Sequence, residues 1–292
     1  MRPFGLLSPE TVEEAAALLE EFGDEAVICA GGTELVLLLK FGLADPAVLV
    51  RLDRLGLDGI EQAEGLLRLG ATVTHSGASG SSVVQAALPL VATALSNIAN
   101  PRVRAVGTLG GNICFAEPHS DLSALFVLHE AVAVLSTGAE ERRVEVGDFL
   151  TGTLSTSRRD EEVLVAVEVP HPPPRTAGGY ARFVIGERPN VVVGCSLEVD
   201  PSGAISRARL VVGCAGPTPV RIPAAEDLLC GVAIDGKELD TAIPEAAATC
   251  AARCEAHDED DLSGWYKRKL VQALSRRSVS SALERARELS VR

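Results

Sequence analysis

The stretch Ala26–Lys40, AVICAGGTELVLLLK, decides how the N-terminal part of the chain folds. Its apolar run Ala26–Ala30 predicts a buried strand, and the apolar spacing in Glu34–Lys40 predicts a helix. Two glycines separate these elements, and Thr33 is a candidate N-cap. Because glycine lets backbone amides approach a ligand and the first amides of a helix are unpaired, this loop is a candidate anion site. A plain turn that needs positive φ explains the glycines equally well.

The segments that flank this stretch also alternate between helix and strand. Ser8–Phe22 is an amphipathic helix with Ser8 as the expected N-cap and Pro9 at the first helical position. Ala47–Leu52 is a second apolar strand. Such alternation predicts a small parallel sheet with covering helices.

From Gly59 onward the pattern becomes a mixture of strands and helices. We expect strands at Leu66–Gly70, Ala131–Ser136, Arg143–Val146 and Glu162–Val169, and helices at Ser82–Ser96 and Asp121–His129. The run Pro170–Pro174 continues neither element, because proline lacks an amide donor and fixes φ. It predicts a linker between two domains.

The C-terminal part predicts a hairpin followed by helices. Strand runs at Ala181–Val199 and Ile205–Val212 flank the turn Asp200–Gly203. The helices are expected at Ala224–Cys230, Pro244–Ala256 and Ser263–Arg287.

Composition limits the functional classes. A chain of 292 residues is expected to form two domains, and 47% hydrophobic residues can bury a sizeable core. The net charge of −13 repels nucleic acid, so we expect no nucleic-acid partner. Neither a signal peptide nor an 18-residue apolar run is present, so we expect a cytoplasmic protein without a membrane span. The seven scattered cysteines predict neither a disulfide framework nor a metal cluster.

A second glycine-rich loop is predicted at Val106–Asn112, VGTLGGN, before the helix that starts at Asp121. Two such loops suit a long ligand with a diphosphate in its middle, which indicates a dinucleotide. Neither matches GxGxxG or GxxxxGK[ST], which disfavours a Rossmann NAD site and a P-loop. Asp121 suits a ribityl or ribose hydroxyl, although capping its helix would explain it as well.

Several segments in the right order resemble the FAD-binding medium subunit of molybdenum hydroxylases, the group of xanthine dehydrogenase and carbon monoxide dehydrogenase. The clearest are AGGTELVLLLK (Ala30–Lys40), GATVTHSG (Gly70–Gly77) and IANPRVRAVGTLGGNICFAEPHSDL (Ile98–Leu122). EVLVAVEVP (Glu162–Pro170), GCAGPTPVR (Gly213–Arg221) and WYKRKLVQALSRR (Trp265–Arg277) extend the likeness over nearly the whole chain.

The resemblance implies an α+β fold with a PCMH-type, vanillyl-alcohol-oxidase-like FAD-binding domain over residues 1–172. That domain would have two lobes, a small parallel βα lobe at 1–56 and an antiparallel α+β lobe at 57–172. A Pro-rich linker at 173–177 would lead to a carbon monoxide dehydrogenase flavoprotein-like domain at 178–289. This second domain would combine a small antiparallel sheet with a helical bundle.

The resemblance also implies which residues bind FAD. The first diphosphate segment would comprise Ile28, Cys29, Ala30, Gly31, Gly32, Thr33, Glu34 and Leu35, and the second Thr108, Leu109, Gly110, Gly111 and Asn112. Ile98 would touch the flavin or its chain, Asp121 the ribityl or ribose, Leu164 the ring system, and Arg182 would stand where relatives have a lysine. Glu34 replaces an aspartate of many relatives, and no aromatic residue stands near Asn190, which leaves open what covers flavin N5. No residue of the chain is expected to be catalytic or to bind a metal.

In such a complex, FAD takes electrons from [2Fe-2S] clusters of a small subunit and passes them to an external acceptor. A large subunit holds molybdopterin, and the assembly would be a heterotrimer or a dimer of heterotrimers. The hydroxylated substrate and the acceptor (NAD, quinone or oxygen) stay open. A self-sufficient FAD-dependent oxidase or reductase is the alternative, but it needs an acid or base over the flavin, and the sequence offers none. A binding protein that has lost its flavin is disfavoured by the two glycine loops.

The remaining candidates carry weaker chemistry. His75 is expected to cap or pack in a turn, and His119, beside the second loop, is a candidate for a contact with the cofactor. The acidic run His257–Asp261 is expected to be a solvated loop, because consecutive carboxylates point in different directions.

Overall fold

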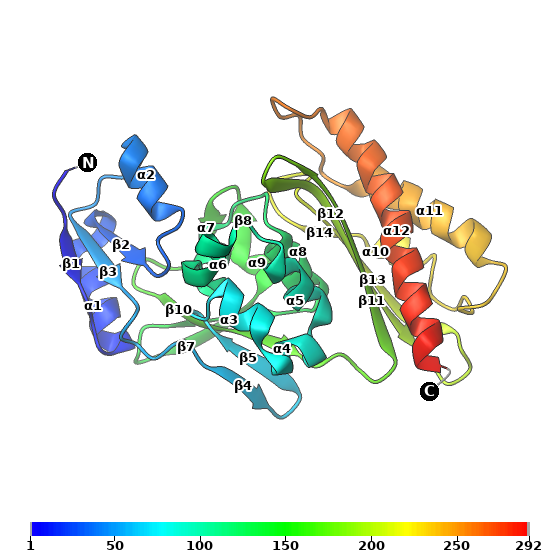
Figure 1. Cartoon of the computed structure of the whole chain (residues 1–292), viewed down its shortest axis with the longest axis horizontal. Coiled ribbons are helices and arrows are strands. Elements are labelled where there is room, and N and C mark those ends of the chain that lie inside the picture. Colours follow the sequence, from blue (N-terminus) through cyan, green and yellow to red (C-terminus); the bar gives the residue numbers. More distant parts are fainter. Residues whose placement is uncertain (1, 291–292) are drawn as a thin grey trace. The chain divides into compact units, whose positions relative to one another are not determined.

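The computed structural model describes residues 2–290, which form two compact units (Figure 1). The first unit comprises Met1–Glu117 and Ala131–His171, and the second comprises Pro118–Glu130 and Pro172–Arg292. The mixed helix and sheet content agrees with the expected fold class. Among the described residues, no helix is both long and apolar enough to cross a membrane.

The first unit begins with a small parallel sheet. Its strands are β1 (Gly5–Leu7), β2 (Ala26–Cys29) and β3 (Val48–Arg51), in the order β1-β3-β2. Both pairings are parallel, as the alternation of strands and helices predicts. The accompanying helices are α1 (Val12–Phe22), the 3-10 turn η1 (Gly23–Glu25) and α2 (Leu35–Phe41). The buried strand expected at Ala26–Ala30 is only half-buried.

Helix α1 starts later than the sequence suggests. Thr11 is its N-cap, and the Thr11 hydroxyl accepts the amide of Glu14 at 3.1 Å. The Glu14 carboxylate in turn accepts the amide of Glu10 at 2.7 Å. Because this Thr-x-x-Glu pair satisfies the first free amides, the prediction of Ser8 as N-cap was wrong.

A five-stranded antiparallel sheet forms the centre of the first unit. Its strands are β4 (Ile60–Ala63), β5 (Leu66–Gly70), β6 (Val132–Ser136), β7 (Glu141–Glu145) and β10 (Val163–Pro170), in the order β4-β5-β10-β6-β7. Helix α9 (Val146–Phe149) and the hairpin of β8 (Leu150–Gly152) and β9 (Ser155–Thr156) follow β7. The central strand β10 is buried along Val163–Val167, which explains its continuous apolar run.

Short helices connect β5 to β6. They are α3 (His75–Gly80), α4 (Ser82–Ala87), α5 (Pro89–Ser96), α6 (Pro101–Val106) and α7 (Leu109–Phe115), after which α8 belongs to the second unit. The single helix predicted over Ser82–Ser96 was wrong, because the chain breaks at Leu88 and Pro89 starts a new helix. The glycine loop predicted before Asp121 was also wrong, since Thr108 is the N-cap of α7.

The second unit is an antiparallel sheet with helices on both faces (Figure 1). Its strands, in chain and spatial order, are β11 (Thr176–Ile185), β12 (Arg188–Val199), β13 (Ile205–Gly213) and β14 (Val220–Arg221). Its helices are α8 (Asp121–Leu128), α10 (Pro223–Glu226), α11 (Leu239–Arg253) and α12 (Gly264–Ser290). The hairpin at Asp200–Gly203 is confirmed, but the strand predicted over Ala181–Val199 is two strands, because Gly186 at φ 71° turns the chain.

The backbone of helix α12 lies directly against the backbone of β11. A Cβ on Gly179 would lie 1.9 Å from the carbonyl oxygen of Ser278, so only glycine fits there. The Ser278 hydroxyl donates to the Gly179 carbonyl at 3.0 Å. The apolar core of this unit lies between the sheet and helices α11 and α12.

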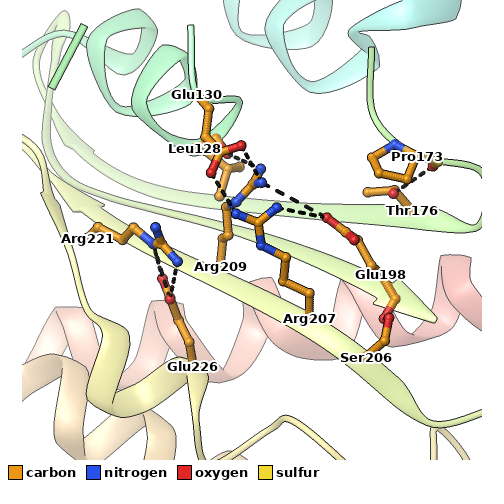
Figure 2. A network of polar contacts seen from close by, with 10 residues as sticks. All are labelled: Leu128, Glu130, Pro173, Thr176, Glu198, Ser206, Arg207, Arg209, Arg221 and Glu226. Carbon is orange, nitrogen blue, oxygen red and sulfur yellow. Dashed lines mark hydrogen bonds and ion pairs between the residues drawn. The ribbon is translucent and has the colours of Figure 1, made fainter. Parts of the chain in front are cut away.

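Polar contacts fix α8 to the sheet of the second unit (Figure 2). Glu130, just beyond the helix, accepts from Arg207 at 2.8 Å and from Arg209 at 2.5 Å. Arg209 also donates to the Leu128 carbonyl at 3.4 Å, at the helix end where carbonyls lack partners. These contacts explain why α8 groups with the C-terminal strands and not with the strands on either side of it in sequence.

Candidate functional site

The loop between β2 and α2 offers amides that the chain itself does not use. Within residues 2–290, the amides of Gly31, Gly32 and Thr33 donate no hydrogen bond. Gly32 has φ 68°, the left-handed conformation that glycine adopts without strain. All three residues are half-buried, so a ligand or water must satisfy these donors.

The rest of the first segment supports this loop. Ile28 and Ala30 pack against the apolar core beneath it, and burial raises the pKa of the Cys29 thiol. Glu34 occupies the N-cap position of α2 without a capping side-chain bond, and Leu35 is half-buried in the first turn. The suggestion that Thr33 caps the helix was therefore wrong.

The structure brings the two glycine segments together. A Cβ on Gly31 would lie 2.1 Å from the Val106 carbonyl oxygen and 2.9 Å from the Gly107 Cα. The first segment thus lies against the backbone that leads into Thr108. Sequence spacing alone could not show this contact, because the segments are far apart along the chain.

The second segment does not offer its amides in the same way. The amides of Leu109, Gly110, Gly111 and Asn112 donate to Val73 O, Ala71 O, Thr108 Oγ1 and Thr108 O at 2.9, 2.9, 3.0 and 3.0 Å. They are therefore committed within the first unit. The backbone of this segment can still lie close to a ligand. Its amides could donate to a diphosphate only if the hydrogen bonds that they make within the chain were broken.

The third motif, Gly70–Gly77, supports the second segment. The amide of His75 donates to the Gly107 carbonyl at 2.9 Å, and a Cβ on Gly110 would lie 2.7 Å from the Ala71 carbonyl oxygen. His75 is 4% exposed, and its Nδ1 has no partner among the described residues. Burial, with a smaller contribution from Arg104, lowers the pKa of His75 to about 4. The imidazole is neutral at pH 7 and serves in packing, as the sequence suggests.

Two further predicted contacts lie elsewhere in the first unit. Ile98 is half-buried in the turn after α5, where the carbonyls of Ile98 and Ala99 accept from Arg104 Nη1 at 2.7 and 2.9 Å. Leu164 is 3% exposed in β10, beside an irregularity in the pairing of β10 with β6.

In the second unit, the buried Asp121 forms a polar cluster with the half-buried Tyr180 and Arg182. Asp121, 2% exposed, accepts from the Tyr180 hydroxyl at Oδ1 and from Arg182 Nη1 at Oδ2, the latter at 2.8 Å. Burial raises the pKa of Asp121, although both partners oppose the shift. Burial, together with the Asp121 charge, also raises the pKa of Tyr180, so its hydroxyl stays a donor.

Asp121 and Arg182 were predicted from the sequence as site residues, and Tyr180 was not. Tyr180 and Arg182 are two residues apart on β11, so they share one face of the sheet, and that spacing is the signal. The suggestion that Asp121 caps its helix was wrong, because Ser120 is the N-cap of α8.

A second polar cluster in this unit involves the acidic run. Lys267 is fully buried, and its Nζ lies 2.6 Å from a Glu259 carboxylate oxygen and 3.3 Å from the Ala215 carbonyl oxygen. His119 contacts the same carboxylate at 3.3 Å and the Pro189 carbonyl at 2.8 Å. Glu259 is thus held by a buried lysine, while His257–Asp261 is exposed throughout, which confirms the expectation of a solvated loop. No metal-binding group of three or more acidic, His or Cys residues occurs in the described part of the chain.

The first unit has a glycine loop with uncommitted amides, and the second unit has a buried carboxylate. Both are features of a dinucleotide-binding protein. Residues 2–172 match the family described as the FAD binding domain in molybdopterin dehydrogenase. Residues 186–282 match the CO dehydrogenase flavoprotein C-terminal domain. The chain belongs to this family of FAD-binding subunits, which confirms the resemblance seen in the sequence and makes it the flavin subunit of an oxidoreductase.

Curated relatives and solved structures agree with this assignment. The carbon monoxide dehydrogenase medium chain of Hydrogenophaga pseudoflava is 30% identical over 95% of this chain and 96% of its own length. The xanthine dehydrogenase FAD-binding subunit of Escherichia coli O157:H7 is 28% identical, with 94% of each chain covered.

Among solved structures, carbon monoxide dehydrogenase from Hydrogenophaga pseudoflava gives a TM-score of 0.91 at 31% identity, covering 98% of this chain and 99% of that one. Quinoline 2-oxidoreductase from Pseudomonas putida 86 gives a TM-score of 0.90 at 27% identity, covering 98% of each chain.

Proposed function

We propose that this chain is the electron-transfer subunit of a molybdenum hydroxylase complex. Its FAD would take electrons from the [2Fe-2S] clusters of a small subunit and pass them to an external acceptor. A large molybdopterin-binding subunit would complete a heterotrimer, single or doubled, in the cytoplasm. The first domain would have the two-lobed PCMH-type fold.

The observation that carries the proposal is the set of uncommitted amides at Gly31, Gly32 and Thr33. Three neighbouring N–H donors on a glycine loop suit the oxygens of a diphosphate, because such donors need an acceptor when water leaves. Gly31 also has no room for a side chain, which keeps the loop backbone against Val106 and Gly107. The residues present therefore fit the group that the family implies.

The two glycine segments have different tasks in this proposal. The first segment, Ile28–Leu35, would donate to the diphosphate. The second segment, Thr108–Asn112, would position the first and approach the cofactor closely without giving up the amides that start α7. Ile98 and Leu164 would supply apolar contacts to the flavin.

Asp121 and Arg182 would act as one unit toward the cofactor. Tyr180 and Arg182 occupy both carboxylate oxygens of Asp121 and hold it in a single orientation. Each carboxylate oxygen has two acceptor sites, so Asp121 can still accept from a ribityl or ribose hydroxyl. Bound FAD supplies the redox chemistry, which the side chains described above do not offer.

A comparison of the isolated chain with the assembled complex tests whether this chain is an electron-transfer subunit that depends on its partners. The isolated FAD-loaded chain should not oxidise purines, aldehydes, aromatic heterocycles or CO. Addition of the large and small subunits should allow the complex's substrate to reduce the flavin under anaerobic conditions. Substrate-dependent turnover by the single chain would refute the proposal in favour of a self-sufficient oxidase.

A further inference from the structure

The first half of α12 carries an aromatic and basic surface that the proposed cofactor site does not use. We call it the α12 patch and define it as Ile185, Trp265, Tyr266, Arg268, Lys269 and Arg276. Trp265 is 65% exposed and Tyr266 is 41% exposed, although aromatic residues make up only 3% of the chain. The one tryptophan and one of the two tyrosines of the whole chain therefore lie at the surface together.

The aromatic side chains of this patch are held in place before any partner binds. Trp265 stacks on Tyr266 with ring centroids 6.5 Å apart, and Phe183 meets Tyr266 edge-on at 6.4 Å. Lys269 Nζ lies 5.7 Å from the centroid of the Trp265 ring. Ile185, at the end of β11, is 44% exposed. A fixed aromatic anchor binds a partner with less loss of side-chain entropy, and Trp, Tyr and Arg are the residues that dominate interface energetics.

The charge of the patch is opposite to that of the chain. The chain carries a net charge of −13, yet Gly264–Leu283 contains no acidic residue. Trp265, Lys269 and Arg276 follow one another at four and seven residues, which places them on one face of α12. Arg268, Lys269 and Arg276 are exposed and form no ion pair among the described residues.

The acidic run before α12 does not cancel this charge. Asp258 accepts the Gly264 amide at 2.6 Å, and Glu259 pairs with the buried Lys267. Asp258, Asp260 and Asp261 are exposed in the run that precedes α12. Arg268, Lys269 and Arg276 are exposed on α12 together with Arg277, so the exposed cations outnumber these three carboxylates. Lys269 lies against the Trp265 ring.

We propose that the α12 patch docks an acidic surface of a partner subunit of the complex. Charge complementarity selects such a partner, and the Trp265–Tyr266 pair provides its apolar anchor. A second copy of the chain in a two-fold arrangement would place like charges opposite each other. An anionic membrane would attract the patch but repel a chain of this net charge. The inference rests on the proposed function, since it needs a complex with partner subunits.

Two variants and one control test this docking. Trp265→Ala removes the anchor, and Lys269→Glu reverses a charge beside it. Lys237→Glu makes the same charge change on an exposed lysine elsewhere in the second unit. We expect Trp265→Ala and Lys269→Glu to weaken association with the partner subunits by about tenfold or more, measured by sedimentation of reassembled complexes. Lys237→Glu should stay within about twofold of the original chain.

Before assembly, the patch variants should have the same FAD content and thermal midpoint as the original chain. A loss of association can then be assigned to docking and not to a loss of folding or of cofactor binding. A complex that fails to bind FAD would contradict the proposed function and not the docking. Wild-type assembly by both patch variants would overturn the docking.

A direct probe of the patch is also available, because Trp265 is the only tryptophan. The chain labelled with 5-fluorotryptophan should give one fluorine resonance from this position. Unlabelled partner subunits should shift and broaden it, whereas vesicles of phosphatidylcholine and phosphatidylserine should not. A resonance that the subunits leave unchanged overturns the proposal, and one that only the vesicles change assigns the patch to a membrane surface instead.

Discussion

A matched pair of substitutions at Gly32 isolates the charge that the candidate diphosphate loop is proposed to bind. Gly32 has φ 68°, and a Cβ there would meet only Cys29 Sγ at 3.6 Å and Val36 Cγ2 at 3.7 Å. A side chain therefore fits, and the main structural cost is the left-handed backbone. Asp and Asn tolerate that conformation better than other residues and differ little in size. Gly32→Asp and Gly32→Asn should thus lower the free energy of unfolding by similar amounts. Only the aspartate adds a negative charge that repels a bound phosphate.

The size of the difference follows from Coulomb's law. A carboxylate about 4 Å from a phosphate charge raises the free energy by about 1 kcal/mol in water and about 4 kcal/mol at the effective dielectric of a protein surface. The loop is half-buried, so the upper part of this range applies. A penalty of about 2 to 4 kcal/mol weakens FAD binding by roughly 30- to 700-fold relative to Gly32→Asn.

Titration of the apoproteins with FAD, followed by flavin fluorescence, measures this ratio directly. Thermal midpoints of the two apoproteins should agree, which confirms equal folding. Dissociation constants within about twofold of each other would refute the idea that this loop holds a phosphate.

Three further substitutions test the close contact at Gly31, the hydrogen bond between Tyr180 and Asp121, and the protonation of His75. Gly31→Ala should lower the free energy of unfolding by about 1 to 3 kcal/mol or more, since its Cβ would overlap the Val106 carbonyl, and urea unfolding that matches the original chain would contradict this close contact. Tyr180→Phe leaves one oxygen of buried Asp121 without its donor and should cost about 1 to 3 kcal/mol in urea unfolding; a cost within error of zero would show that Asp121 is not held by this hydroxyl. Burial lowers the pKa of His75 to about 4 in the folded chain, so as pH falls the imidazole is protonated in the unfolded chain before it is protonated in the folded one. Protonation of the unfolded chain therefore lowers the free energy of unfolding as pH falls from about 6.5 toward 4. The original chain should therefore lose about 2 kcal/mol more than His75→Asn between pH 7 and pH 5, and equal losses would mean that His75 is protonated in the folded chain.

Local signals in the sequence were sufficient for most elements of the fold. Apolar runs and turn residues predicted β2, β3, β5, β6, β10, β13 and the hairpin at Asp200–Gly203, because these patterns depend on neighbouring residues alone. The short strands β1, β4, β8, β9 and β14 were not predicted. Helix starts were less secure. Ser8 and Thr11 are both good caps, and only the pairing of Thr11 with Glu14 decides between them.

The candidate site was harder, because its geometry depends on contacts between distant segments. The glycines of the second segment look like a loop, yet Val73 and Ala71 supply carbonyls that accept the first amides of α7 and so stabilise a helix there. The same tertiary effect places α8 in the second unit, where Arg207 and Arg209 hold Glu130. The patch on α12 gave no sequence signal of exposure, because an aromatic pair at the start of a helix is more often part of a core.

The identity and amount of the bound flavin show whether the loop at Gly31–Thr33 holds a diphosphate. Chain purified with its cofactor, or the apoprotein reconstituted with equal FAD and FMN, is denatured and the released flavin is separated by chromatography. We expect FAD in near-stoichiometric amount and little FMN, because the free amides of Gly31, Gly32 and Thr33 are proposed to meet the diphosphate that FMN lacks. Equal retention of FMN, or no flavin after reconstitution, would contradict it.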